Sequence, residues 1–322
     1  MLQSLQGWIA SIGAENVDVF MYQAVYRDFF MPLNTWQYQI EWYQDLNDLG
    51  VNSYMFNLGN TFNKAEAQTT FSAFKTYIDS RAMMDRNVTF TELKDEFFGV
   101  NGYYGAAGST MRTYFEQLVS VMEGLKQDGS NGYINPIQLL DSSTSDAVRR
   151  QAFFNGHYGY DFVSVAFGGK KSSNSGITGA DIFTYDGQTQ QATLESWYTM
   201  CQEALALVVD NPVYAKRVQV EALFPEYAFL VLESTYTTNA MWISNSYSGS
   251  VTAEKGTSEV ITKTYQEFYD NVIALGVTKP AEFFDFNTGD TMTLDTMSTI
   301  ASGTIFTYGM YQSMYMNWGI SF

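Results

Sequence analysis

Cysteine and histidine are almost absent from this chain of 322 residues, which has one of each, Cys201 and His157. One cysteine excludes an internal disulfide bond and a metal site with several thiolate ligands, but it leaves the cellular compartment open. Cys201 falls on the apolar side of a predicted helix, which favours a buried small side chain. One histidine excludes a site with several imidazole ligands. Since phosphate loops, dinucleotide fingerprints and nucleophile elbows are also missing from the sequence, we predict no metal and no cofactor.

Positive charge and long apolar runs are scarce as well. The chain has 17 basic and 34 acidic residues, a net charge of −17, and such a field repels phosphate backbones, so we expect no nucleic-acid partner. No apolar run approaches the ~20 residues that span a bilayer, so we expect no membrane span. Residues 1–13 lack the basic start of a signal peptide. If the parent protein is exported, its signal is expected outside this sequence.

Aromatic residues are abundant, at 16 % of the chain, whereas charged residues also make up only 16 %. That charged share is below the usual ~25 %. Exposed tyrosine or tryptophan faces on such a surface could stack on sugar rings. The alternative interpretation is that most of these rings are core or half-buried packing residues.

The first part of the chain alternates strand and helix patterns. The predicted order is strand, helix, strand, helix, over residues 17–23, 36–49, 51–57 and 64–84. Asn34 or Thr35 can cap the first helix, and Gly50 can end it. Because a crossover helix returns the chain in the same direction, this order predicts parallel pairing of the two strands.

Residues 89–118 join this region to one with mainly helical patterns. Leu93 and Phe97 share one face of a predicted helix, and apolar residues recur with the same period from Met111 to Met122. Small residues at 105–108 would let two backbones approach closely between these helices. The stretch therefore predicts a helix, a tight glycine corner and a second helix.

Regular structure is predicted again in the C-terminal half. Thr193 is expected to cap one helix, Pro212 to begin a second with a proline kink near Glu221, and Ser258 to begin a third. Glycine, serine and aromatic residues mix without a helical period before these helices. That composition predicts a long loop near 156–190, with a short hairpin as one possibility.

The residues of the junction carry a family resemblance. Between Phe97 and Tyr114 the chain contains FF, YYG, AA and MR in this order, and the sequence similarity to the same family extends through 42–60 and 74–85. These segments resemble domain-of-unknown-function family 4838, bacterial proteins similar to alpha-glucuronidases and other glycoside hydrolases. The resemblance implies an α+β, mostly helical fold. Residues 1–86 would be the last two βα units of a (β/α)8-type barrel, and residues 87–322 would be an α-helical C-terminal domain.

Two βα units cannot close a barrel, which takes roughly 250 residues. Parallel strands are usually covered on both faces and at both edges. Either the upstream half of the same parent protein covers the exposed edge, or the N-terminal region packs on the helical part in a reduced form. The resemblance also implies a secreted or cell-surface parent.

Glycoside hydrolysis needs two carboxyl groups facing one pocket, and barrel enzymes hold them at the C-terminal ends of strands. The predicted strands end at Tyr22-Gln23 and at Asn57, so neither end supplies an acid. Members of the resembling family commonly have Glu-Gln-Gly where this chain has Asn57-Leu58-Gly59. An amide can bind a sugar hydroxyl but cannot transfer a proton at neutral pH. Tyr22, Gln23, Tyr26 and Asn57 are therefore predicted to contact sugar, and catalytic residues stay unassigned.

Three further groups admit two interpretations. Asp28, in the loop after the first strand, is either a candidate acid or a solvated or capping carboxylate. His157 is either a proton donor in a sugar-facing loop or a structural histidine. Residues 285–290, DFNTGD, only faintly resemble a calcium loop, because the alternating ligands and the final glutamate are missing.

The resemblance thus implies the C-terminal portion of a glycoside-hydrolase-like protein that binds an oligosaccharide or polysaccharide, and the lack of acids at the strand ends predicts that it is not catalytically competent alone. The alternative is a non-catalytic protein-interaction or scaffold module of a bacterial surface protein.

Overall fold

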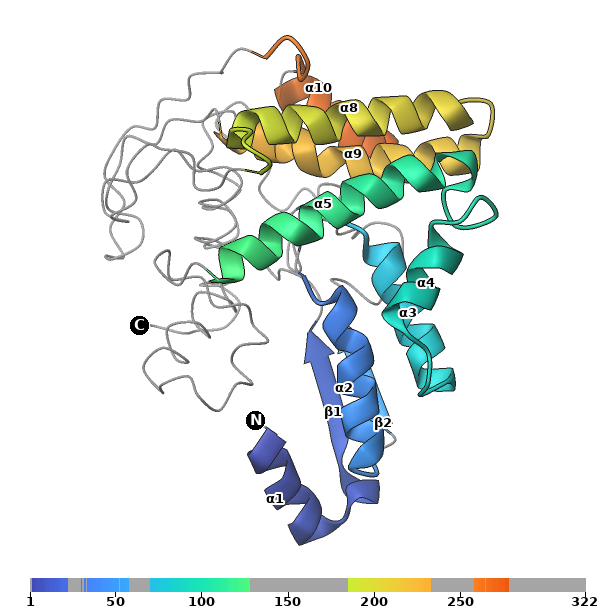
Figure 1. The fold of residues 1–322 in the computed structure, drawn as a ribbon, viewed down its shortest axis with the longest axis vertical. Helices are drawn as coiled ribbons and strands as arrows, with labels where there is room; N and C mark the ends of the chain where they lie inside the picture. Colours follow the sequence, from blue (N-terminus) through green and yellow to red (C-terminus); the bar gives the residue numbers. More distant parts are fainter. Residues whose placement is uncertain are drawn as a thin grey trace, which may run out of the picture.

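The computed structural model describes residues 2–22, 30, 32, 34–51, 53–57, 70–127, 185–232, 258–263 and 265–277. Within these residues the chain is mostly helical, with one two-stranded sheet, as the predicted α+β class requires. Figure 1 shows the sheet and its adjacent helices below a set of long helices that cross the top of the molecule. We call α5, α8, α9 and α10 together the helical layer.

The sheet pairs its two strands in parallel, which confirms the predicted pairing. The register runs from Asp18 opposite Ser53 to Tyr22 opposite Asn57. Helix α2 makes the crossover between the strands, and α3 follows the second strand, while α1 and a short 3-10 turn precede the first (Figure 1). The bounds are α1 (Leu2–Ile12), η1 (Ala14–Asn16), β1 (Asp18–Tyr22), α2 (Trp36–Asp48), β2 (Ser53–Asn57) and α3 (Ser72–Met84).

Helix α2 is held by its apolar face. Trp36, Ile40 and Tyr43 are buried along it. Thr35 occupies the position before the first turn, but its side chain makes no capping hydrogen bond, so the predicted capping role of Thr35 is wrong. Gly50 has φ of +79° beyond the last turn, a conformation that glycine adopts without steric cost.

Helix α3 begins later than predicted, at Ser72 instead of residue 64. Phe71, just before it, has φ of 51° and ψ of 32°, a left-handed conformation that cannot continue a right-handed helix. Residues 64–69 lie outside the described residues. The helical period of the sequence does not reveal this break, because the ring of Phe71 is held by contacts with distant parts of the chain.

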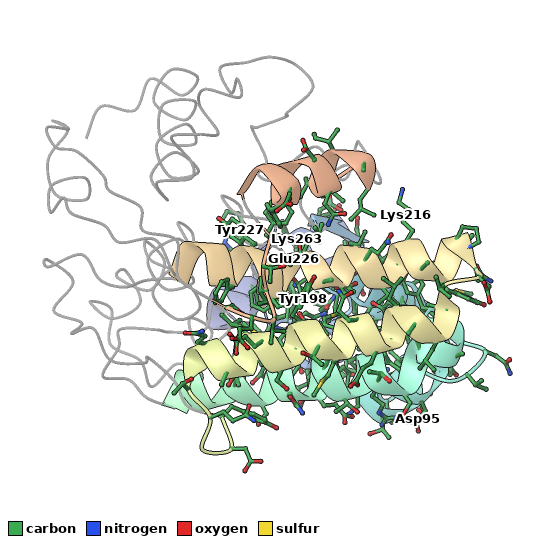
Figure 2. The ribbon with its side chains drawn as sticks, turned by 90° about the horizontal axis from the view of Figure 1, so that it is seen from above. Asp95, Tyr198, Lys216, Glu226, Tyr227 and Lys263 are labelled. Atoms are coloured by element: carbon green, nitrogen blue, oxygen red, sulfur yellow. The ribbon has the colours of Figure 1, made fainter. Side chains whose placement is uncertain are left out.

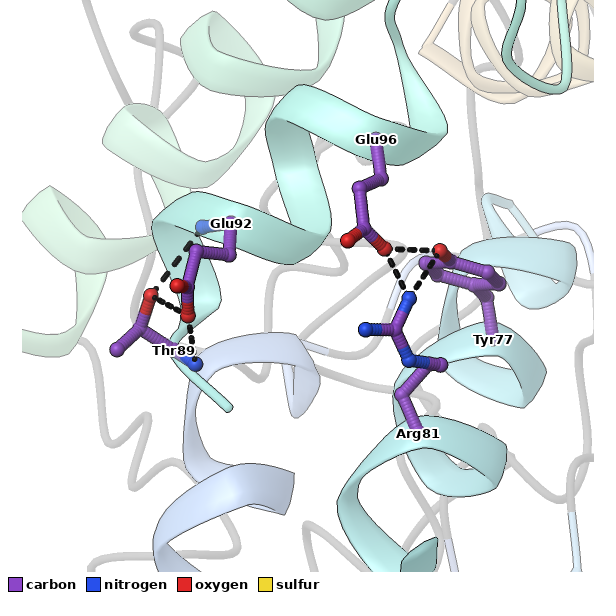
Figure 3. Close-up of polar contacts among 5 residues, drawn as sticks. All are labelled: Tyr77, Arg81, Thr89, Glu92 and Glu96. Atoms are coloured by element: carbon purple, nitrogen blue, oxygen red, sulfur yellow. Dashed lines mark hydrogen bonds and ion pairs between the residues drawn. The ribbon is translucent and has the colours of Figure 1, made fainter. Parts of the chain in front are cut away.

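Helix α4 (Phe90–Phe97) begins with a capping box (Figure 3). Thr89 Oγ1 accepts the backbone N–H of Glu92 at 3.2 Å, and Glu92 Oε2 accepts the backbone N–H of Thr89 at 2.9 Å. Figure 3 also shows Glu96 of α4 accepting hydrogen bonds from Tyr77 and Arg81 of α3. These contacts fix the first turn of α4 and its position against α3.

Replacing Thr89 by alanine is expected to lower the free energy of unfolding by about 1 kcal/mol, because the backbone N–H of Glu92 loses its acceptor and the Glu92 carboxylate loses the hydroxyl of Thr89. Urea denaturation followed by circular dichroism measures this change. Thr113→Ala is the control, since Thr113 is exposed within a helix and its hydroxyl bonds only the backbone of its own helix. Equal stability of Thr89→Ala and wild type would contradict the capping role.

The glycine corner after α4 has the close backbone approach that was predicted. It contains η2 (Gly105–Ala107) and leads into α5 (Gly108–Gln127). A Cβ atom on Gly108 would lie 2.2 Å from the carbonyl oxygen of Phe98, and one on Gly102 would lie 2.2 Å from that of Phe97. Side chains at these two positions would force the backbones apart, so the sequence needs glycine there.

The remaining helices are α8 (Gln190–Val208), α9 (Pro212–Leu232) and α10 (Tyr265–Ala274). Helix α9 begins at Pro212 as predicted. Two other predicted starts are wrong. Thr189, not Thr193, caps α8 by accepting the N–H of Ala192. Helix α10 begins at Tyr265 and not at Ser258, whose hydroxyl accepts backbone N–H groups in a non-helical segment. The bend near Glu221 stays a prediction. None of the described helices is long and apolar enough to cross a membrane.

A two-residue hairpin turn precedes α8. Asp186 and Gly187 have φ of 50° and 76°, and Tyr185 pairs with Gln188 across the turn. Positive φ at both central residues is typical of the type I′ turn that Asp-Gly favours. The rest of the long loop predicted near 156–190 lies outside the described residues.

Buried side chains from both ends of the described chain form one hydrophobic cluster, which runs from Val17 to Val277. Phe115 of α5 contacts the ring of Trp36 at 5.1 Å and that of Phe71 at 5.1 Å between ring centroids. The helical layer therefore packs directly on the segment that carries the sheet.

Candidate functional site

The strands bring together two of the residues predicted to contact sugar. Tyr22 and Asn57 are the last residues of β1 and β2 and pair directly in the register. Gln23 and Tyr26 lie outside the described residues, and so do Asp28, His157 and residues 285–290. The candidate site is thus built at the C-terminal ends of the two parallel strands.

Two connections leave these strand ends, one before α2 and one before α3, and the described part of each contacts the other. Thr70 Oγ1 donates a hydrogen bond of 2.9 Å to the backbone oxygen of Phe30. Both residues are buried. This bond ties the end of the β2–α3 connection to the β1–α2 connection.

The helical layer contacts the first connection through aromatic rings. Phe30 is 5.2 Å from Tyr227 of α9 and 5.5 Å from Phe268 of α10, measured between ring centroids. These contacts place α9 and α10 against the chain that follows the strand end at Tyr22.

Phe71, at the end of the second connection, is held on every side. Its N–H donates to Glu221 Oε2 of α9 at 2.8 Å, and its carbonyl accepts from Trp36 Nε1 at 3.3 Å. A left-handed conformation at a non-glycine residue costs roughly 1–3 kcal/mol and persists where the surroundings determine it. Here the surroundings are aromatic rings 5.1–6.5 Å from that of Phe71, those of Trp36, Phe98, Tyr104, Tyr114 and Phe115.

Glu221 is a buried acid whose partners are neutral donors. Its second oxygen, Oε1, accepts the hydroxyl of Tyr104 at 2.8 Å. Burial raises the pKa of Glu221 to about 7, and the bonds from Phe71 and Tyr104 oppose that rise. Burial, together with the charge of Glu221, raises the pKa of Tyr104 well above its ordinary value. The sequence interpretation considered Glu221 only as the place of a kink. The signal in the sequence that could have identified Glu221 is an acidic residue within the apolar run of α9.

A second buried acid, Glu226, lies one turn further along α9. Lys263 Nζ donates to Glu226 Oε1 at 2.6 Å, and both residues are labelled in Figure 2. Burial raises the pKa of Glu226, while Lys263 opposes the rise. This ion pair fastens the segment before α10 to α9.

The pair of helices beside the sheet has its own buried polar group. Asp79 Oδ1 accepts Gln39 Nε2 at 2.7 Å and the hydroxyl of Tyr43 at 3.0 Å. Lys75 is fully buried, with Nζ 4.8 Å from the centroid of the Trp36 ring. Burial lowers the pKa of Lys75 to about 7, against the opposing charge of Asp79. These contacts join α2 to α3.

The arrangement suits holding a backbone more than proton transfer. Glu221 is buried, and its two oxygens accept hydrogen bonds from the backbone of Phe71 and the hydroxyl of Tyr104, so this carboxyl group is occupied with protein donors. Cys201 is buried, as predicted, and burial raises the pKa of its thiol, which makes it a poor nucleophile. No cluster of three or more potential metal ligands occurs among the described residues.

Comparison of the chain with protein-family models, curated proteins and solved structures found no match.

Proposed function

We propose that this chain is the closing, carbohydrate-binding portion of a glycoside-hydrolase-like protein with a (β/α)8-type barrel. The observation that carries the proposal is the parallel β1–β2 pair, which brings Tyr22 and Asn57 to the same edge. In barrels of this type the C-terminal ends of the strands hold the ligand. Tyrosine rings stack on sugars and amides bind hydroxyl groups, so these residue types suit an oligosaccharide or polysaccharide.

The upstream half of the same parent protein is the proposed partner of the N-terminal segment. Helix α1 packs Leu5 and Ile9 toward the core, yet Trp8 is 65 % exposed and Ile12 is 45 % exposed. In a barrel the helix before a strand has neighbouring helices on both sides, which would cover such residues. Because the strand ends here supply tyrosine and an amide, the acid residues for hydrolysis would come from that upstream half. The parent protein would be secreted or on the cell surface.

Wild-type protein is expected to bind either uronic-acid-containing or neutral oligosaccharides in calorimetric titrations, and Tyr22→Ala and Asn57→Ala are each expected to weaken binding about tenfold. Tenfold corresponds to about 1.4 kcal/mol, as expected for the loss of one stacked ring or of hydrogen bonds to a hydroxyl. Tyr185→Ala and Asn101→Ala are the matched controls, since Tyr185 lies in the hairpin and Asn101 in the α4–α5 corner. If the wild type bound neither sugar class, the proposal would be contradicted. The same holds if Tyr22→Ala and Asn57→Ala both bound sugar with the affinity of the wild type.

A protein-interaction module is the second candidate, and one observation favours it. Leu207, Val209 and Val213 are each more than half exposed at the corner between α8 and α9. Neighbouring exposed aliphatic side chains are typical of a protein-binding surface. The sugar titration separates the candidates, because a scaffold module has no need of affinity for sugar at Tyr22 and Asn57.

A further inference from the structure

We infer that Glu221 is a positioning residue, through which the helical layer holds the backbone next to the carbohydrate site in its binding conformation. The inference rests on the proposed function. It concerns Phe71 and Thr70, which end the connection from β2, and not a contact between Glu221 and the sugar itself.

The conformation of Phe71 needs an external acceptor. With φ of 51°, Phe71 stands before the first turn of α3, and its buried N–H donates to Glu221 Oε2, 150 positions away in sequence. A buried N–H without an acceptor costs about 1–3 kcal/mol. Removing the carboxyl group would therefore favour a different backbone conformation at Phe71, one that also relieves the left-handed strain.

The effect of this one bond extends to the described parts of both connections that follow the strands. Thr70, adjacent to Phe71, donates its hydroxyl to the backbone oxygen of Phe30 in the connection from β1. A backbone shift at Phe71 moves Thr70 and strains or breaks that bond. The described parts of both connections thus depend on one carboxyl group of α9.

An apolar residue would serve packing alone better than Glu221 does. Burial raises the pKa of this carboxyl group, which reports the unfavourable desolvation of its charged form. A leucine would avoid that desolvation but would leave the amide of Phe71 without an acceptor. Glutamine would keep both contacts, because its amide oxygen can accept from Phe71 while its NH2 group donates to the hydroxyl oxygen of Tyr104.

The test compares Glu221→Leu, Glu221→Gln and Glu226→Leu. Glu226→Leu makes the same change at another buried acid of α9, whose partner is Lys263 and not the backbone of Phe71. Two quantities are measured for each variant: the Kd for the oligosaccharide that the wild type binds best, and the hydrogen-exchange rate of the Phe71 amide. Glu221→Leu is expected to raise both at least tenfold, whereas Glu221→Gln and Glu226→Leu are expected to stay within about twofold of wild type.

The outcomes separate the two proposals. Wild-type binding with an unchanged Kd in Glu221→Leu would overturn the positioning role alone, and so would an equal loss of affinity in Glu226→Leu. Absence of sugar binding by the wild type would overturn the proposed function, and the exchange rate of Phe71 would then decide by itself whether Glu221 holds this backbone. An exchange rate that does not change in Glu221→Leu would overturn the inference in either case.

Discussion

Replacing Phe71 by alanine is expected to lower the free energy of unfolding by about 3–5 kcal/mol, as the loss of a large buried aromatic side chain does. The ring is fully buried and has aromatic neighbours from α2, from the corner after α4 and from α5. Alanine leaves a cavity and also keeps the unfavourable left-handed backbone. Urea denaturation of the purified variant measures the change.

Phe71→Gly separates the ring from the backbone. Glycine adopts positive φ without steric cost, so this variant is expected to be about 1 kcal/mol more stable than Phe71→Ala although it loses the same ring. Phe90→Ala is the packing control, since Phe90 is only half-buried and contacts Phe74 and Phe115. A loss below about 1 kcal/mol in Phe71→Ala would contradict the central place of this ring in the core.

The free energy of unfolding is expected to pass through a minimum near pH 7, and Glu221 produces the acidic side of it. The pKa of Glu221 is about 7 in the folded chain, against an ordinary value of 4.5. Between these values the folded state binds more protons than the unfolded state, so stability falls as the pH rises, by about 3 kcal/mol in total. Glu226, whose pKa burial also raises, acts in the same direction.

Lys75 produces the alkaline side. Its pKa is about 7 in the folded chain, against an ordinary value of 10.5. Between these values the folded state binds fewer protons than the unfolded state, so stability rises with pH across this window. Above about pH 10 the buried tyrosines reverse the trend, because burial raises the pKa of Tyr104 and Tyr114 and the folded state again binds more protons.

Urea denaturation at intervals from pH 5 to 9.5 measures the free energy of unfolding on both sides of the minimum. Two variants serve as controls for each other. Glu221→Gln is expected to flatten the fall below pH 7 while leaving the rise above it, and Lys75→Met is expected to do the reverse. A stability maximum near pH 7 would contradict the prediction. So would a Glu221→Gln profile with the acidic side of the wild type.

Local backbone chemistry explains which elements could be predicted. The parallel pairing of β1 and β2 follows from a crossover helix between two strand patterns. The corner after α4 follows from glycines at positions where a side chain would collide with a carbonyl oxygen, as at Gly108. The start of α9 follows from Pro212, which lacks the N–H that a first turn does not use. Each of these signals lies within one continuous stretch of the chain that contains the feature it predicts.

Two of the wrong predictions have their cause in distant contacts. The period of α3 extends upstream in the sequence, but Phe71 is pulled into a left-handed conformation by partners 35 and 150 positions away, Trp36 and Glu221. Ser258 does not begin α10, because its hydroxyl bonds nearby backbone and donates to Glu195 of α8. The predicted capping role of Thr193 is wrong for a local reason. Thr189, one turn earlier, caps α8, and its backbone oxygen accepts a hydrogen bond from the hydroxyl of Thr193.

By itself the sequence determined the order of strands and helices, the positions that only glycine can occupy and the lack of an acid at either strand end, since these depend on residue type and local spacing. Only the tertiary structure decided that Glu221 lies against Phe71 and that Thr70 bonds Phe30. A hydrogen bond between residues far apart in sequence leaves no periodic pattern, because its geometry exists only after the helices have packed.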